Sequence, residues 1–187
     1  AQTAALAPEL QKIAGYRFGD SREPLTVVQE MARSSTGDRR IELERQFAAM
    51  LGMSDATYEC KDFVCRQLWR MGTKESIPAL AGLMESDPGY GDMARYALER
   101  NTDPLAAQAI RAPLEAAFKS GGFAEEKSLF YIGLINSLGA RRDAGSITVL
   151  DRIINGKNAN LAAAAVAAIG KIGGPRARAI LALAKGN

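Results

Sequence analysis

Two cysteines are the first residues whose chemistry must be considered, and they lie five positions apart at Cys60 and Cys65. Both fall in one predicted helix, where a rise of about 1.5 Å and a turn of about 100° per residue point them in different directions. A disulfide would require Cys60 to precede that helix. The chain has no histidine, which removes the commonest metal ligand and general base. We therefore predict two small core residues, no metal site and no cofactor.

Carboxylate pairs are the next candidates for catalysis, because glycosidases use two carboxylates that face each other across a cleft. The neighbouring pairs in this chain are Glu42 and Glu44, Asp55 and Glu59, and Glu125 and Glu126. Nothing in their spacing selects one pair as facing a cleft, and exposed helix charges are the simpler interpretation. We predict that the protein has no catalytic residue and is not an enzyme.

Basic side chains recur with the period of the repeat described below, as at Arg70 and Arg100. A ladder of this kind would suit an acidic protein segment, a phosphate or an anionic glycan. The alternative is that these residues end helices, where they offset the helix dipole and pair with Asp103 or Asp143. The candidate binding face comprises Arg66, Arg70, Arg95, Tyr96, Arg100, Arg141 and Lys171.

Aromatic residues offer a further means of binding, since their rings can stack on sugars or bases. The candidates are Trp69, Tyr90, Tyr96 and Tyr131. Aromatic residues at helical spacing more often belong to the core, and we favour that interpretation for this group.

Composition and charge are those of an ordinary globular protein. Hydrophobic residues make up 47% of the 187 positions, charged residues make up 24%, and the net charge is +3. A dedicated nucleic-acid binder carries a stronger and more clustered positive charge, so nucleic acid is not the expected partner. No apolar stretch approaches the roughly 20 residues that span a bilayer. The start at Ala1 fits a removed signal peptide or a fragment, and we expect a periplasmic or secreted protein, with the cytoplasm as the alternative.

An internal repeat provides the framework for these residues. The equivalent positions, at steps of 30, 40 and 31 residues, are Leu68, Leu98, Leu138 and Ile169. Twelve residues after each stands an apolar residue, namely Leu80, Ile110, Leu150 and Leu181. Five residues after each stands a turn or helix-start residue, namely Thr73, Asp103, Asp143 and Gly174. A loop at residues 119–123 accounts for the long step.

Each repeat unit is predicted to be a helix, a tight turn and a second helix. Helix starts are marked by Pro88, Pro104 and Pro175, because proline fits the first turn of a helix at little cost. Strand signals are nearly absent. The pattern predicts an all-α protein of about 10–11 helices, in which stacked helix pairs share one core.

The segment at residues 65–80, CRQLWRMGTKESIPAL, resembles a HEAT repeat of the bacterial kind. It has a small-residue turn followed by an apolar-Pro-Ala-Leu helix start, and residues 138–143 and 169–173 fit the same pattern. The resemblance covers roughly residues 38–187 and implies a right-handed α-α superhelix of HEAT-like helix pairs.

For function, the resemblance implies a scaffold that binds a protein partner, as a module of a larger exported bacterial protein, and the missing histidine and unpaired carboxylates lead us to expect no catalysis. The alternative function is the binding of an anionic ligand, nucleic acid or glycan, through the basic ladder on the concave face.

The two ends of the chain depart from the regular repeat. Residues 1–37 are predicted to be capping helices, with a leading helix at 4–14 and a second helix from an N-cap at Ser21 through about Arg33. A helix at 38–50 opens the HEAT-like part, which is predicted to continue as a single domain through residue 187. Residues 176–185 match the first helix of a further repeat without its partner. Either the native chain continues, or the apolar edge is covered by another subunit, as in a dimer.

Overall fold

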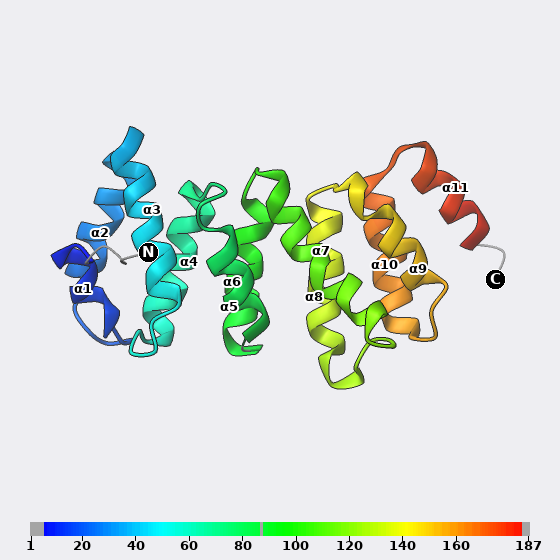
Figure 1. The fold of residues 1–187 in the computed structure, drawn as a ribbon, viewed down its shortest axis with the longest axis horizontal. Coiled ribbons are helices and arrows are strands. Elements are labelled where there is room, and N and C mark those ends of the chain that lie inside the picture. The colour runs from blue at the N-terminus through cyan, green and yellow to red at the C-terminus, as the bar shows by residue number, and fades with distance from the viewer. Residues whose placement is uncertain (1–5, 87, 185–187) are drawn as a thin grey trace. The chain divides into compact units, whose positions relative to one another are not determined.

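The computed structural model describes residues 6–86 and 88–184 of the chain. Within these ranges the protein has eleven α-helices, two single helical turns and no strand (Figure 1). The all-α fold class predicted from the sequence is therefore confirmed. The chain divides into two compact units, and the division falls between Asp103 and Pro104.

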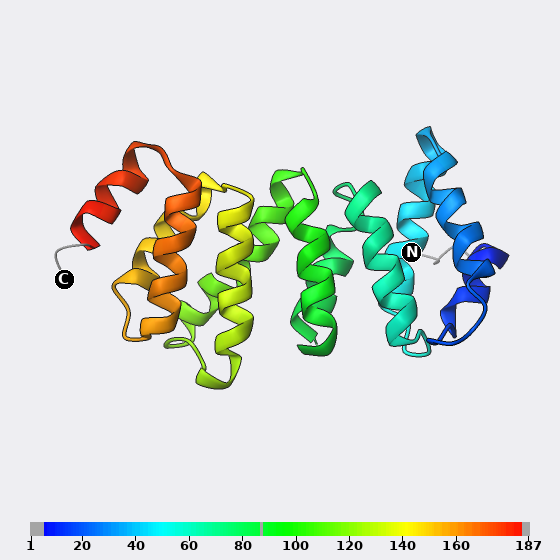
Figure 2. The same cartoon turned by 180° about the vertical axis from the view of Figure 1, so that it is seen from behind.

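The first unit has two layers of helices and a cap. Its helices are α1 (Pro8–Ala14), α2 (Glu23–Ser34), α3 (Gly37–Leu51), α4 (Tyr58–Met71), α5 (Ile77–Ser86) and α6 (Pro88–Arg100). Helix α4 packs beside α6 in one layer, and α3 packs beside α5 in the other (Figures 1 and 2). The layers meet where α3 contacts α4 and where α5 contacts α6, and the cap helices α1 and α2 pack on each other.

The second unit repeats this two-layer arrangement. Its helices are α7 (Pro104–Lys119), α8 (Ser128–Ala140), α9 (Ile147–Ile154), α10 (Ala159–Ile172) and α11 (Gly174–Ala184). Single helical turns at Glu125–Lys127 and Ala144–Ser146 lead into α8 and α9. Helix α8 packs beside α10, α7 packs beside α9, and α11 contacts both α9 and α10.

The repeat positions occupy matching places in the core. The residues Leu68, Leu98, Leu138 and Ile169, on α4, α6, α8 and α10, are all 0% exposed. Their followers Leu80, Ile110 and Leu150, on α5, α7 and α9, are also 0% exposed. Full burial of one such side chain contributes about 2 kcal/mol, so this register carries much of the packing energy of each unit. Leu181 on α11 is only half-buried.

A buried carboxylate fixes the turn between α4 and α5. Glu44 on α3 is 0% exposed and accepts hydrogen bonds from the Thr73 and Ser76 backbone N–H groups over 2.6 and 3.1 Å. The Thr73 hydroxyl donates to its other oxygen over 2.9 Å. The expectation that Glu44 is an exposed helix charge is therefore wrong. A buried carboxylate is stable there because charge-assisted hydrogen bonds replace its lost hydration.

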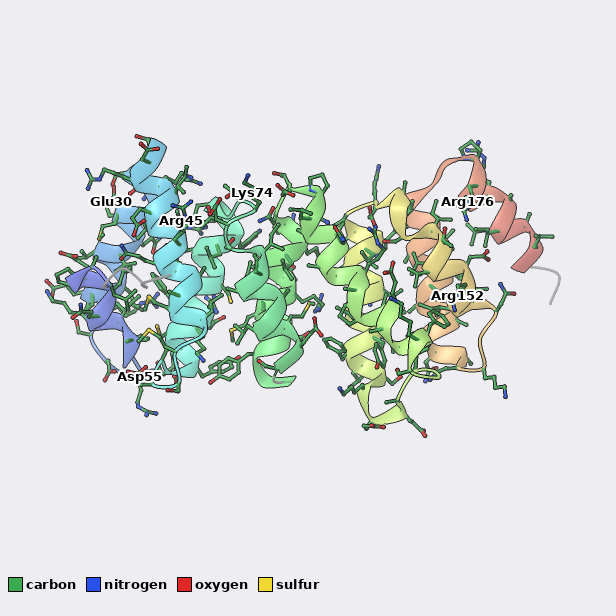
Figure 3. All side chains as sticks on the ribbon, in the orientation of Figure 1. Glu30, Arg45, Asp55, Lys74, Arg152 and Arg176 are labelled. Atoms are coloured by element: carbon green, nitrogen blue, oxygen red, sulfur yellow. The ribbon has the colours of Figure 1, made fainter. Side chains whose placement is uncertain are left out.

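The corresponding turn of the second unit uses the opposite arrangement of charge. Asp143 lies within the turn, and Arg111 on α7 donates to its carboxylate over 2.6 Å. The hydroxyl of the buried Ser146 donates to the same carboxylate. Arg45 pairs with Glu75 in the first unit over 3.0 Å, and Arg176 donates to Thr148 in the second over 3.0 Å. Figure 3 labels the two arginines, Arg45 on α3 and Arg176 on α11.

Most of the predicted helix bounds hold within one or two residues, with exceptions near the N-terminus. Helix α1 begins at Pro8, because proline without an N–H group fits the first turn, and residues 4 and 5 of the expected leading helix lie outside the described residues. Ser21 is not the N-cap of α2; Arg22 is, although the Ser21 hydroxyl accepts from the Glu23 N–H over 3.3 Å. The helix start expected at Pro88 is confirmed, since α6 begins there. The domain boundary expected near residue 38 coincides with the start of α3 and stays a prediction.

The predicted insertion loop follows α7 directly. Gly121 and Gly122 have φ angles of 99° and 137°, which other residues rarely adopt. The turn brings Phe123 back onto Phe118 and Tyr131, with ring centroids 5.0 and 4.9 Å away. The loop therefore closes on an aromatic cluster of its own unit.

Candidate functional site: a groove between α4 and α6

Helix α4 presents two faces of opposite character. The Thr57 hydroxyl caps its start by accepting from the Cys60 N–H over 3.2 Å. Residues at spacings of three and four form its buried face, namely Cys60, Val64, Leu68 and Met71. The opposite face carries Tyr58, Arg66, Trp69 and Arg70, which are exposed. The amphipathic pattern of α4 buries Leu68 and therefore also places the aromatic and basic residues on the exposed face.

Helix α6 runs parallel to α4. At the N-terminal ends, the rings of Tyr58 and Tyr90 lie 5.4 Å apart. At the C-terminal ends, the Asn101 side-chain amide donates to the Thr73 carbonyl over 2.8 Å. Contacts at both ends fix the direction of the two helices, so residues one repeat apart come to lie side by side.

A groove of about 540 Å³ separates the outward parts of the two helices. It is lined by Tyr58, Asp62, Cys65, Arg66, Trp69, Arg70, Asp92, Met93, Tyr96 and Ala97. Trp69 and Tyr96 meet edge to face, with centroids 6.1 Å apart and planes at 86°. The Arg100 guanidinium stands over the Trp69 ring, 5.8 Å from its centroid. The groove therefore combines two contacting aromatic rings with the positive charge of Arg100.

Ion pairs neutralise some of the charged side chains around the groove. Arg66 pairs with Asp62 over 2.7 Å. Arg95 pairs with Asp92 over 2.9 Å and with Glu99 over 3.8 Å. Its side chain is only 16% exposed, so Arg95 is held by these carboxylates and does not line the hollow.

The structure places only part of the predicted candidate binding face at the groove. Arg66, Arg70 and Tyr96 line the groove, and Arg100 covers one of its aromatic walls. Arg95 lies on α6 but in ion pairs. The two remaining residues belong to the second unit, where Arg141 follows α8 and Lys171 is exposed in the last turn of α10.

The exposed aromatic residues differ from expectation. Trp69 and Tyr96 are 40% and 47% exposed, so the core interpretation is wrong for them. It is right for Tyr131, which is 7% exposed. The groove also uses Asp62 and Asp92, which the sequence interpretation missed. Their separation of 30 residues equals that of Leu68 and Leu98, and the repeat alignment would have revealed it.

The two cysteines are buried free thiols on α4. The prediction of core packing is confirmed, because helix α4 begins before Cys60 and keeps the thiols apart. Burial raises the pKa of the Cys60 thiol to about 11. Burial, with a smaller contribution from Asp62, raises the pKa of Cys65 to about 12, while Lys61 lowers it slightly. Both thiols are thus protonated at neutral pH, although Cys65 reaches the groove floor.

Residues 6–86 and 88–184 contain neither a candidate metal cluster nor a candidate membrane-spanning helix. No three His, Cys, Asp or Glu side chains of these residues lie close enough together to hold a metal ion. None of the helices formed by these residues has both the length and the apolar character needed to cross a membrane. The α4–α6 groove, where exposed aromatic and basic side chains line a hollow, is the candidate site.

Comparison with known proteins adds no assignment. No protein-family model matches the sequence, and no curated protein matches it significantly.

Proposed function

We propose that the protein is a HEAT-like helical scaffold, and that the groove between α4 and α6 binds a segment of a partner protein. The observation that carries the proposal is the exposed pair Trp69 and Tyr96 at the edge of a 540 Å³ hollow. Tryptophan, tyrosine and arginine are the residues that most often dominate binding energy at protein interfaces.

The groove residues are not needed to build the helix pair. In the repeat register, Trp69 corresponds to Gly139 on α8, and Tyr96 corresponds to Ala167 on α10. Helices α8 and α10 pack together with these small residues. Large aromatic side chains that stay exposed, where the same architecture manages without them, support a role in binding.

The proposal includes binding without catalysis. The two carboxylates that line the groove, Asp62 and Asp92, each pair with an arginine on their own helix. Both carboxylates of the groove are thus already engaged by arginine side chains. Glu44, the buried carboxylate of the first unit, is occupied by the turn that it caps.

The right-handed superhelix of HEAT-like pairs is part of the same proposal. Within each unit, successive helices alternate between two layers, and the repeat positions are buried in register. Stacked repeats of this kind present long grooves between neighbouring second helices. The α4–α6 groove is one such place.

Selection of displayed peptides on the immobilised protein tests the proposed function. Peptides enriched on the wild-type protein should lose binding to a Trp69→Ala/Tyr96→Ala variant. A matched control is Phe18→Ala/Leu129→Ala, which removes two large apolar side chains that are 75% and 85% exposed and lie outside the groove. Enriched peptides that bind all three proteins equally, or no enrichment above background, would contradict the proposal.

An anionic ligand remains the second candidate function, because Arg70 and Arg100 are exposed at one end of the groove. Such binding would weaken steeply with salt, since counterions released from the ligand drive it. A gel shift with duplex DNA and retention on a polyuronate resin, each at about 50 and 200 mM salt, test it. No retention at the lower salt would end this candidate.

A further inference from the structure

The charges along the α4–α6 groove are ordered. Asp62 and Asp92 occupy equivalent repeat positions, near the starts of α4 and α6. Arg70 and Arg100 also occupy equivalent positions, in the last turns of the same helices. Because the helices are parallel, the acidic positions lie toward one end of the groove and the basic positions toward the other.

Of these four charged residues, the two arginines keep uncompensated charge. Asp62 and Asp92 are paired within their own helices over 2.7 and 2.9 Å. Within the described residues, Arg70 and Arg100 have no carboxylate within ion-pair distance. A helix C-terminus offsets about half an elementary charge, so a net positive potential remains there. A bound group at this end should be an anion.

The middle of the groove is apolar. Its floor includes Cys65 and Ala97, each 1% exposed, together with the side chain of Met93. Trp69 and Tyr96 form the walls. An apolar side chain gains free energy when it leaves water for such a place, whereas a sugar ring would bury hydroxyl groups without partners. The floor therefore favours a peptide side chain over a glycan.

Nucleic acid fits the groove less well than a peptide. Affinity for a duplex grows with the number of phosphates that are neutralised, and this groove offers two uncompensated arginines. Two arginines next to an apolar floor instead match a peptide carboxylate next to a large apolar residue.

We propose that the groove binds an acidic peptide segment that carries one large apolar side chain. The apolar side chain enters the hollow over Met93 and packs against the paired rings of Trp69 and Tyr96, and the neighbouring Asp or Glu carboxylates meet Arg70 and Arg100. This inference rests on the proposed function, because it names the ligand of the same groove.

Synthetic peptide pools provide the probes for the test. Each peptide has about eight residues, since an extended chain of that length spans about 27 Å, and the 14 residues of α4 rise about 21 Å. A central Leu or Phe is flanked by Asp and Glu in one pool, by Lys and Arg in a second, and by Ser and Gly in a third. The chain has one tryptophan, Trp69, so its fluorescence reports occupancy of the groove directly.

The acidic pool should change the Trp69 fluorescence saturably, at concentrations at least about tenfold below those required by the other two pools. An Arg70→Glu/Arg100→Glu variant should weaken binding of the acidic pool at least about tenfold. The matched control, Lys157→Glu/Arg178→Glu, makes the same change in net charge at exposed positions of the second unit and should bind as the wild type does. Circular dichroism confirms that each variant keeps its helices.

The alternative results separate the two proposals. Equal or tighter binding of the neutral or basic pool at Trp69 overturns the acidic ligand and leaves the protein-binding groove standing. Saturation by oligogalacturonate or a DNA duplex at lower concentrations than the acidic pool overturns the peptide class. The absence of any saturable fluorescence change with all three pools overturns both proposals.

Discussion

Helices α4 and α6 of the first unit and helices α8 and α10 of the second are built on the same register but have different surfaces. The groove positions Tyr58, Asp62, Arg66, Trp69, Arg70, Asp92 and Tyr96 correspond in order to Ser128, Ile132, Asn136, Gly139, Ala140, Ala163 and Ala167. Each of these seven aromatic or charged residues is replaced by a small, apolar or neutral polar one, whereas Arg100 corresponds to Lys171. The architecture therefore does not require the groove residues.

Packing explains the difference between the two pairs. A Cβ atom placed on Gly139 would lie 2.8 Å from the Cα of Ala168, so α8 and α10 touch backbone to backbone. At the corresponding place in the first unit, Trp69 stands outward beside Ala97. Small residues let α8 and α10 pack closely together. In contrast, large side chains line a groove between α4 and α6.

The turn between α4 and α5 also differs from the equivalent turn between α8 and α9. In the first unit, the carboxylate comes from α3 to a turn containing Thr73. In the second unit, the equivalent residue Asp143 is itself the carboxylate, and Arg111 on α7 provides the cation. Equivalent turns are thus held by two different sets of residues, and the first unit depends on the single carboxylate of Glu44.

The largest expected effect on stability is at that point. Glu44→Ala should lower the free energy of unfolding by about 3 kcal/mol, because two backbone N–H groups lose a charged acceptor in a buried place. Glu42→Ala removes an exposed carboxylate from the same helix and should cost less than about 0.5 kcal/mol. Urea denaturation followed by circular dichroism measures both values. Equal losses in the two variants would contradict the assigned role of Glu44.

A smaller effect should appear at alkaline pH and should come from the first unit. Cys60 and Cys65 correspond to Phe130 and Ile135, which do not titrate. The thiol pKa values are raised to about 11 and about 12 in the folded protein. The folded state therefore holds its protons more tightly than the unfolded state above pH 9, and raising the pH through this window favours unfolding.

The expected loss from the two thiols between pH 8 and pH 10 is about 2 kcal/mol. It should be absent from a Cys60→Ala/Cys65→Ala variant, which is less stable at pH 8 but less sensitive to the rise in pH. Urea denaturation of both proteins at the two pH values makes the measurement. An identical pH dependence of wild type and variant would show that the thiols are not protected.

The closed helix pair of the second unit can be tested at Gly139. Gly139→Ala should destabilise the protein by about 1 kcal/mol, since the cost of forcing α8 and α10 apart exceeds the gain in helix propensity. Gly170→Ala on α10 is the matched control, because a Cβ there meets no atom within 4 Å. That variant should be neutral or more stable in thermal unfolding. A stabilised Gly139→Ala protein would mean that the two helices are not in close contact.

The sequence predicted the features that depend on local pattern. Periodic apolar residues such as Leu68 and Leu98 identified the second helices, and prolines such as Pro104 marked helix starts. Glu44 could not be recognised, because its partners Thr73 and Ser76 lie about 30 residues away and contact it only through the fold. Its sequence neighbours gave no sign that this carboxylate is buried.

The binding face was predicted in part for a related reason. Repeat spacing identified Arg70 and Arg100 but could not show that Arg95 is held by Asp92 and Glu99. The exposure of Trp69 was also missed, because a helical pattern places a residue on a face and does not say what covers that face. Alignment of the acidic residues by the repeat period would have added Asp62 and Asp92.

Backbone amide and indole N–H shifts in NMR, followed during titration with a peptide selected on the wild-type protein, test the central claim most directly. The chain's only indole is that of Trp69, so its N–H resonance reports the groove itself. The account predicts that the largest shift changes fall on this indole and on α4 and α6, while α8 and α10 stay unchanged. Largest changes on α8 and α10, or changes spread evenly over both units, would contradict the claim that the α4–α6 groove is the binding site.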